Sequence, residues 1–149
     1  MKKSALLLTI LFGMFVLSYA QNTMKLRYPK CELTSAAVSA ETKGIKTFEI
    51  TTQEEFDKYF KLTDGNTINF ENNMVLAAIV GDDEADKYIQ VDAASFISSK
   101  ARTVYVRYDI REQQDKNYSK FSVAVIQKTN YKKVLFLKGK KYNMAISGG

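Results

Sequence analysis

The pattern of apolar and polar residues predicts a protein made mostly of β-strands. Residues 74–81 are apolar at nearly every position and are bounded by turn-forming residues, which is typical of a strand covered on both faces. Residues 103–110 alternate between apolar and polar side chains, and residues 121–127 place Phe121, Val123 and Val125 on one face, as strands do. We therefore expect residues 74–81 to form the centre of the fold.

Further strands are expected on both sides of this segment, joined by short turns. Residues 21–30 are polar and hold the only proline, so we expect a partly ordered leader there. Residues 134–137 are expected to pair back on the preceding strand, and Gly139 to turn the chain into a last strand. The remaining predicted strands are residues 31–38, 45–50, 88–97 and 142–146.

One helix is expected, at about residues 52–62. Thr52 and Glu55 fit the S/T-x-x-E capping box, in which each side chain satisfies a free backbone N–H at the helix start. Apolar residues then follow at i, i+3 and i+4 spacing and make one face: Phe56, Tyr59 and Phe60. The pattern as a whole predicts an α+β fold with a mostly antiparallel sheet, curled or folded into a sandwich, and this helix packed over one side or end.

The start of the chain is typical of a secretory signal peptide. After a basic start, an apolar run covers residues 5–17 and ends in the small residues Ser18–Ala20. The run is shorter than the roughly 20 apolar residues of a spanning helix. We expect cleavage after this triplet, which leaves a single domain of residues 21–149 in the periplasm or outside the cell, with no transmembrane segment. Gln21 stands where a bacterial lipoprotein would need cysteine, so no lipid anchor is expected.

Charge and cysteine content narrow the possible partners. Two of the 22 basic residues lie in the signal segment, so the exported chain carries 20 basic and 16 acidic residues, a net charge of +4. These charges are spread along the chain, which does not favour a nucleic-acid partner. Cys31 is the only cysteine, so it has no partner for an intramolecular disulfide. It is expected to be a small buried side chain or an exposed thiol that bridges to another molecule.

The residue types exclude most enzyme chemistries. The chain has no histidine, which excludes Ser-His-Asp triads, Cys-His pairs and histidine metal sites. Its glycines form no phosphate-binding loop. We expect no enzyme activity and no cofactor. The routes left open are a Ser-Lys dyad, calcium bound at the acidic residues 82–86, and a carboxylate pair drawn from Asp82, Asp83, Glu84, Asp86 and Asp109.

Two groups of residues could instead form a binding surface. One is the acidic turn with the tyrosine that follows it, and the other is a set of late tyrosines with large contact areas. These candidate residues are Asp82, Asp83, Glu84, Asp86, Tyr88, Tyr105, Tyr118, Tyr131 and Tyr142. The C-terminal third also holds a basic group that suits either soluble strand edges or an anionic surface: Lys128, Lys132, Lys133, Lys138, Lys140 and Lys141.

Three stretches, residues 50–56 (ITTQEEF), 68–81 (INFENNMVLAAIVG) and 121–128 (FSVAVIQK), resemble parts of one known family. Together they make residues 45–141 similar to the C-terminal domain of the PrcB-like protease-complex-subunit family. That family follows its core strand with a glycine-rich turn ending in Gly-Gly-Tyr, of which only Tyr88 is retained here. The resemblance implies a non-catalytic exported protein that binds or stabilises another exported protein, such as a protease.

The expected function is therefore an exported, non-catalytic protein-binding module that stabilises or regulates a secreted protease or a complex of the bacterial envelope. A small-ligand or glycan-binding β-domain is one alternative, because the late tyrosines could form an aromatic face. A carboxylate-dependent hydrolase is the other alternative, and it requires two carboxylates about 5–10 Å apart in a cleft.

Overall fold

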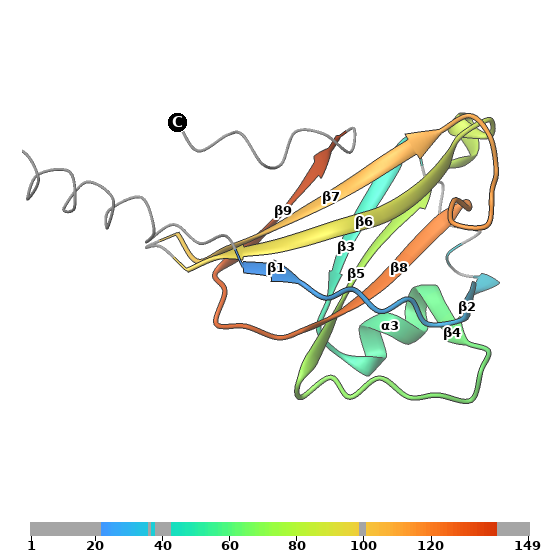
Figure 1. The fold of residues 1–149 in the computed structure, drawn as a ribbon. Helices are drawn as coiled ribbons and strands as arrows, with labels where there is room; N and C mark the ends of the chain where they lie inside the picture. The colour runs from blue at the N-terminus through green and yellow to red at the C-terminus, as the bar shows by residue number, and fades with distance from the viewer. Residues whose placement is uncertain (1–21, 36, 38–42, 99–100, 140–149) are drawn as a thin grey trace, which may run out of the picture.

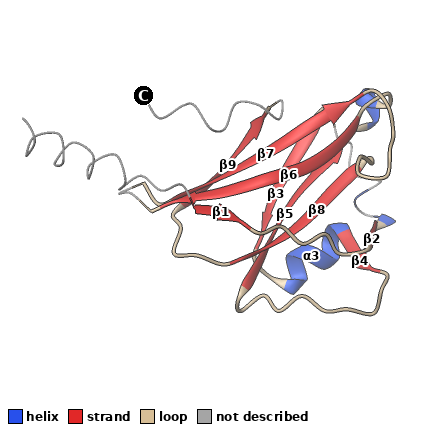
Figure 2. Cartoon of the chain, viewed as in Figure 1, coloured by secondary structure: helices blue, strands red, loops and turns tan. Residues whose placement is uncertain are grey.

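A computed structural model of the chain describes residues 22–35, 37, 43–98 and 101–139. The predicted signal peptide and the predicted strand at residues 142–146, with Tyr142, lie outside these residues. Strands dominate the described part, with one α-helix and one 3-10 turn (Figures 1 and 2). In chain order the elements are β1 (Asn22–Met24), β2 (Cys31–Leu33), β3 (Ile45–Ile50), α3 (Gln53–Tyr59), β4 (Phe60–Leu62), β5 (Asn73–Val80), η1 (Asp82–Glu84), β6 (Tyr88–Ile97), β7 (Thr103–Arg111), β8 (Phe121–Gln127) and β9 (Lys133–Lys138).

The strands form two packed sheets and one small pair. Sheet A has the strand order β1-β6-β7-β9, sheet B has the order β3-β5-β8, and β2 pairs with β4. Every pairing is antiparallel except that of β7 with β9. The predicted α+β class with a sheet sandwich is therefore confirmed.

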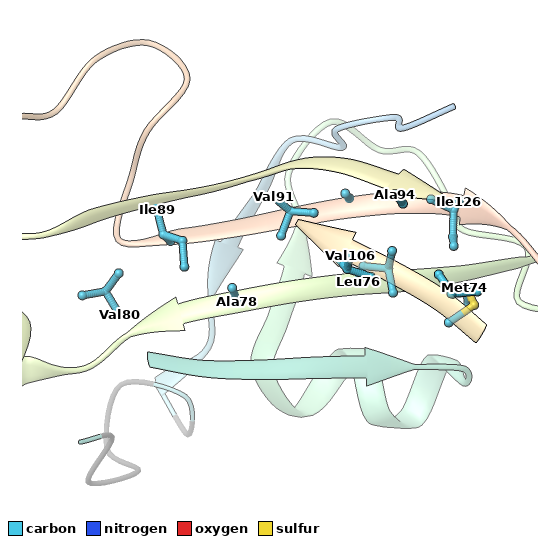
Figure 3. Close-up of a cluster of buried hydrophobic side chains, with 11 residues drawn as sticks. Met74, Leu76, Ala78, Val80, Ile89, Val91, Ala94, Val106 and Ile126 are labelled. Carbon is cyan, nitrogen blue, oxygen red and sulfur yellow. The ribbon is translucent and has the colours of Figure 1, made fainter. Parts of the chain in front are cut away.

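β5 lies at the centre of sheet B and is buried on both faces, as its unbroken apolar sequence predicts. One face packs against sheet A and forms the larger core (Figure 3). Because successive side chains of a strand point to opposite faces, the residues of β5 divide between two cores. The larger core takes Met74, Leu76, Ala78 and Val80 from β5, Ala124 and Ile126 from β8, Ile89, Val91 and Ala94 from β6, and Val104 and Val106 from β7.

The opposite face of sheet B is covered by α3 and the β2–β4 pair. Val75, Ala77 and Ile79 of β5 pack there against Phe56 and Phe60, both of which are fully buried. The two phenylalanine rings lie 5.5 Å apart between centroids and are tilted, an arrangement that aromatic pairs favour. The molecule therefore has three layers, with sheet B in the middle.

The helix begins where its capping box predicts. The hydroxyl of Thr52 accepts the amide of Glu55 at 3.2 Å, and the Glu55 carboxylate accepts the amide of Thr51 at 3.0 Å. The helix ends at Tyr59, however, and the prediction that it reaches residue 62 is wrong. Phe60 is already extended (φ −136°, ψ 150°). From Phe60 onward the chain pairs with β2 as β4, and these backbone bonds take the place of another helical turn.

Residues 22–30, most of the segment expected to be a partly ordered leader, contact both sheets through backbone pairing. β1 pairs with β6 at the edge of sheet A, and Arg27 then exchanges two backbone hydrogen bonds with Val125 of β8, of 3.0 and 2.7 Å. We call residues 22–30 the N-terminal strap, because they join both sheets before entering β2. The strand predicted at 31–38 ends at Leu33, where the amide of Ala37 bonds the carbonyl of Thr34.

β9 does not pair back on β8, so that prediction is wrong. The loop after β8 carries the chain from sheet B to sheet A, where β9 lies parallel to β7 with Val134 beside Val104 and Phe136 beside Val106. The amide of Lys132 bonds the carbonyl of Arg102 at 2.7 Å as the chain arrives. Sheet A gains its fourth strand in this way.

A bulge in β6 places an ion pair on the outer face of sheet A. The register between β6 and β7 shifts at Val91/Ala93, and the extra residue, Asp92, accepts two hydrogen bonds from Arg107 at 2.8 and 3.1 Å. Both side chains are nearly buried, at 10% and 11% exposure. Next to the bulge, the amide of Val91 donates to the Ser122 hydroxyl at 2.9 Å and so ties β6 to β8.

Breaking this pair should destabilise the fold strongly. Asp92→Ala leaves the Arg107 guanidinium buried without its counter-charge, so we expect a loss of about 3–5 kcal/mol in the free energy of unfolding. The double variant Asp92→Ala/Arg107→Met should recover most of this loss. The measurement is urea denaturation followed by circular dichroism.

The control is Glu32→Ala, which breaks an exposed pair with Lys61 (59% and 74% exposed) and should cost about 0–1 kcal/mol. An Asp92→Ala variant that loses no more stability than Glu32→Ala would contradict this reading of the bulge.

Candidate functional site

The acidic turn is folded and its charges are partly used internally. Residues 82–84 form the 3-10 turn η1, and Asp83 accepts the amide of Gly44 at 2.7 Å. Gly44 itself has a positive φ of 68°, and its carbonyl accepts the amide of Gly81 at 2.7 Å. Glu84 forms an ion pair with Lys87. The turn is therefore fastened to the loop before β3 rather than being a free acidic loop.

Lys120 and Tyr88 lie next to the acidic turn, where the chain leads into β6. The ammonium group of Lys120 donates to the carbonyls of Ala85 and Lys87, the latter at 2.8 Å. It also lies 4.2 Å from the centroid of the Tyr88 ring, within the range of a cation–π contact. Lys120 therefore holds the chain between η1 and β6 against the start of β8.

Tyr118 lies at the same end of the sandwich. Its hydroxyl donates to Asp109 at 2.8 Å, and the guanidinium of Arg111 lies 4.2 Å from its ring centroid. Arg111 also stands opposite Tyr88 in the β6–β7 pairing, which brings the two tyrosines to one end. Burial, followed by the hydrogen bond to Asp109, raises the pKa of Tyr118 to about 12. We call this region the acidic-turn end; it comprises residues 82–88, Asp109, Arg111, Tyr118 and Lys120.

The other predicted tyrosines lie elsewhere. Tyr105 stands between Ser95 and Leu135 in sheet A, six residues along β7 from the acidic-turn end. Tyr131 follows β8, and its hydroxyl donates to Glu49 of β3. Tyr142 lies outside the described residues. Tyr105, Tyr118 and Tyr131 therefore lie in different parts of the structure.

The acidic residues do not gather into a metal-binding group. No cluster of three or more candidate ligands occurs within the part of the chain that the structure describes. Asp83 and Glu84 are engaged as above, and Asp109 accepts the Tyr118 hydroxyl and lies 3.7 Å from Arg111. Asp83 and Asp109 thus accept hydrogen bonds from a backbone amide and a tyrosine hydroxyl within the chain.

Two clefts flank the N-terminal strap where Tyr28 and Pro29 cross between the sheets. The larger, of about 410 Å³, is bounded by the strap, β8 and the polar side chains of Gln90, Lys116 and Asn117. The smaller, of about 330 Å³, lies on the other side of the strap, beside residues 64–68. The charged residues that line the larger cleft, Lys30 and Lys116, are both exposed.

Cys31 lines the larger cleft and is partly buried. Burial, and secondarily the charge of Asp64, raises the pKa of its thiol to about 11. The thiol therefore stays protonated at neutral pH and is a weak nucleophile, because the thiolate is the reactive form. Of the two predicted states, partial burial in the core agrees better with this environment.

β9 carries two exposed leucines beside three of the lysines predicted as a basic group. Leu135 and Leu137 are 38% and 46% exposed and lie on the outer face of sheet A, whereas Val134 and Phe136 pack into the core. We define the β9 surface as these two leucines with the exposed lysines around them: Lys132, Lys133 and Lys138.

The basic group predicted in the C-terminal third divides in two. Lys128 donates to the carbonyl of Phe70, and Lys140 and Lys141 lie outside the described residues. The three lysines of the β9 surface form no ion pair with any described residue. The sequence KVLFLK contained a signal for this surface, because a strand that is apolar at both alternate sets exposes one set when only one face of its sheet is covered.

Comparisons of the chain with family models, curated proteins and solved structures found no match. Among the described residues, no helix is long and apolar enough to span a membrane. The function must therefore be argued from the surfaces of the protein itself.

Because the pKa of Tyr118 is raised in the folded chain, the free energy of unfolding should fall at alkaline pH. The unfolded chain loses this phenolic proton near the ordinary pKa of 10.0, and the folded chain near 12. The unfolded state thus binds fewer protons between these values, so the stabilisation is complete below pH 10 and is lost as pH rises to 12. We expect urea midpoints to fall over this range, and to fall less steeply in Tyr118→Phe.

Cys31, Tyr28 and Tyr131 also have raised pKa values, so they add to the fall in both proteins. The difference between the two pH profiles isolates Tyr118. Parallel profiles from pH 9 to 12 would contradict the assignment.

Proposed function

We propose that this chain is an exported, non-catalytic protein-binding module, and that the β9 surface is where it contacts its partner. The observation that carries the proposal is the exposure of Leu135 and Leu137 side by side on an edge strand. Exposed edge strands with apolar side chains are prone to pair with other chains, and natural proteins usually block or cover them. Among the described residues no further strand covers this edge of sheet A, and this favours a role in binding.

The rest of the surface supports this choice over the acidic-turn end. At the acidic-turn end, the charged groups of Asp83, Glu84 and Lys120 already contact other groups of the chain. At the β9 surface, by contrast, the lysines form no ion pair with described residues, and the leucines leave apolar area in water. Transfer of apolar area out of water supplies about 25 cal/mol per Å², which a bound partner would gain.

Other features agree with this proposal. The absence of histidine removes the commonest catalytic bases and metal ligands. The resemblance to the PrcB-like family implies a binding partner among exported proteins, such as a secreted protease or an envelope complex. The signal-like start would deliver the chain to the compartment where such partners lie.

The proposal predicts position-dependent crosslinking. A photo-crosslinking amino acid replacing Leu137 in the full chain, expressed in its own host, should form an adduct with one defined exported protein. The same amino acid at Lys61 is the control, because Lys61 is exposed on β4 in the opposite outer layer. Adducts are identified by mass spectrometry.

Equal adducts at both positions, or none at position 137 in a protein shown to be folded by circular dichroism, would contradict the proposed contact surface. Loss of the adduct when Leu135 is also changed to Ser would support it, because Leu135 does not carry the crosslinker.

Export is tested separately. The chain recovered from the periplasm or the medium should begin at Gln21, so its intact mass should correspond to residues 21–149. Recovery of the uncleaved chain from the cytoplasm would contradict the proposed location.

A further inference from the structure

The edge of β9 has a defined set of free backbone groups. Gly139, directly after β9, donates its amide to the carbonyl of Tyr108 at 3.1 Å. In a parallel ladder the groups that face the neighbouring strand belong to every second residue. The amides and carbonyls of Leu135 and Leu137 therefore face β7, and those of Val134, Phe136 and Lys138 face the open edge of sheet A.

This edge differs from the opposite side of the sandwich. There the N-terminal strap pairs with β6 through β1 and with Val125 of β8. On the β9 side the described residues add no further strand to sheet A, and the contact between Tyr131 and Glu49 links the chain to β3 of sheet B. Figure 1 shows β9 as the outermost strand of its sheet.

The side chains around these groups have one sign of charge. Lys133 is exposed at the start of β9 and Lys138 at its end, with Leu135 and Leu137 between them. Two copies of this strand paired antiparallel would bring their lysines together, and opposed like charges destabilise a strand pair. The charge pattern therefore favours a partner of opposite sign over a second copy.

We propose that β9 binds an extended acidic segment of another exported protein by strand addition. The segment becomes a fifth strand of sheet A, with apolar side chains against Leu135 and Leu137 and carboxylates near Lys133 and Lys138. Main-chain bonds to Val134 and Phe136 supply affinity, and the side chains supply the choice of partner. This inference rests on the proposed function and specifies how the same surface recognises its partner.

The first test uses synthetic peptides and the full exported chain. The probe is a labelled peptide of about eight residues, long enough to span β9, with valines spaced to lie beside Leu135 and Leu137 and glutamates spaced to lie beside Lys133 and Lys138. We expect saturable binding by fluorescence anisotropy that weakens as salt is raised. Leu135→Ser/Leu137→Ser should weaken binding at least about tenfold, whereas Lys61→Glu should leave it unchanged.

A charge swap tests the recognition. Lys133→Glu/Lys138→Glu should lose the acidic peptide and gain the matching peptide in which lysine replaces glutamate. Since this variant binds a peptide again, a loss caused by misfolding is distinguished from a loss of recognition. If both peptides bind the wild-type chain equally, recognition by charge is overturned.

Amide hydrogen exchange gives the most specific readout. Added peptide should slow exchange at Val134 and Phe136, whose amides face the edge, and leave Leu135 and Leu137 unchanged, because they already bond β7. A peptide N-methylated at alternate residues should fail to give this protection. Binding without the alternating pattern would overturn strand addition.

Two results would assign the edge to another occupant and overturn the proposal. One is protection of Val134 and Phe136 without peptide that disappears in a chain ending at Gly139, which would identify residues 140–149 as the occupant. The other is protection that grows with protein concentration alone, which would identify a second copy. If crosslinking at position 137 succeeds but no peptide protects the edge, the proposed function stands and strand addition fails.

Discussion

The structure depends on the burial of β5 on both faces. A strand apolar on both faces must be covered twice, so sheet A packs on one side and α3 with the β2–β4 pair on the other. The fully buried Leu76 and Val75, adjacent in sequence, belong to different cores for this reason. The positions of the surfaces follow from this arrangement, because each outer layer has one face left for solvent.

The two sides of the sandwich differ in how the described residues cover the sheet edges. The N-terminal strap closes one side with backbone bonds that reach β6 and β8, and Tyr28 adds a 2.7 Å hydrogen bond to the carbonyl of Val91. The other side ends in β9, where alternation places two leucines outside. This asymmetry explains why the clefts flank the strap while the exposed apolar edge lies at the opposite side.

The sequence predicted those features that depend on local chemistry. The capping box at Thr52 and the unbroken apolar run of β5 each act within a few residues, and both were located correctly. Pairing between distant segments was not predictable in this way. The alternation of Val134 and Phe136 fits a core-facing strand beside β8 or β7 equally well, so the pattern alone does not identify the neighbour.

The candidate site was predicted only in part for the same reason. Tyr88 and Tyr118 lie at one end because Arg111, which contacts the Tyr118 ring, pairs with Tyr88, whereas Tyr131 is carried to Glu49 by the crossing to sheet A. The strap was missed because backbone bonds hold it, and these leave no trace in the order of side chains. The exposure of Leu137 became visible only once β9 was placed at an edge.

We propose that this protein meets its partner at the open edge of β9. The most direct test is a crystal structure of the full exported chain bound to the protein captured from its host. We expect an extended segment of that partner beside β9, bonded to Val134 and Phe136, as a fifth strand of sheet A. A partner seated on the acidic-turn end or in the clefts beside the strap, with β9 left free, would contradict it.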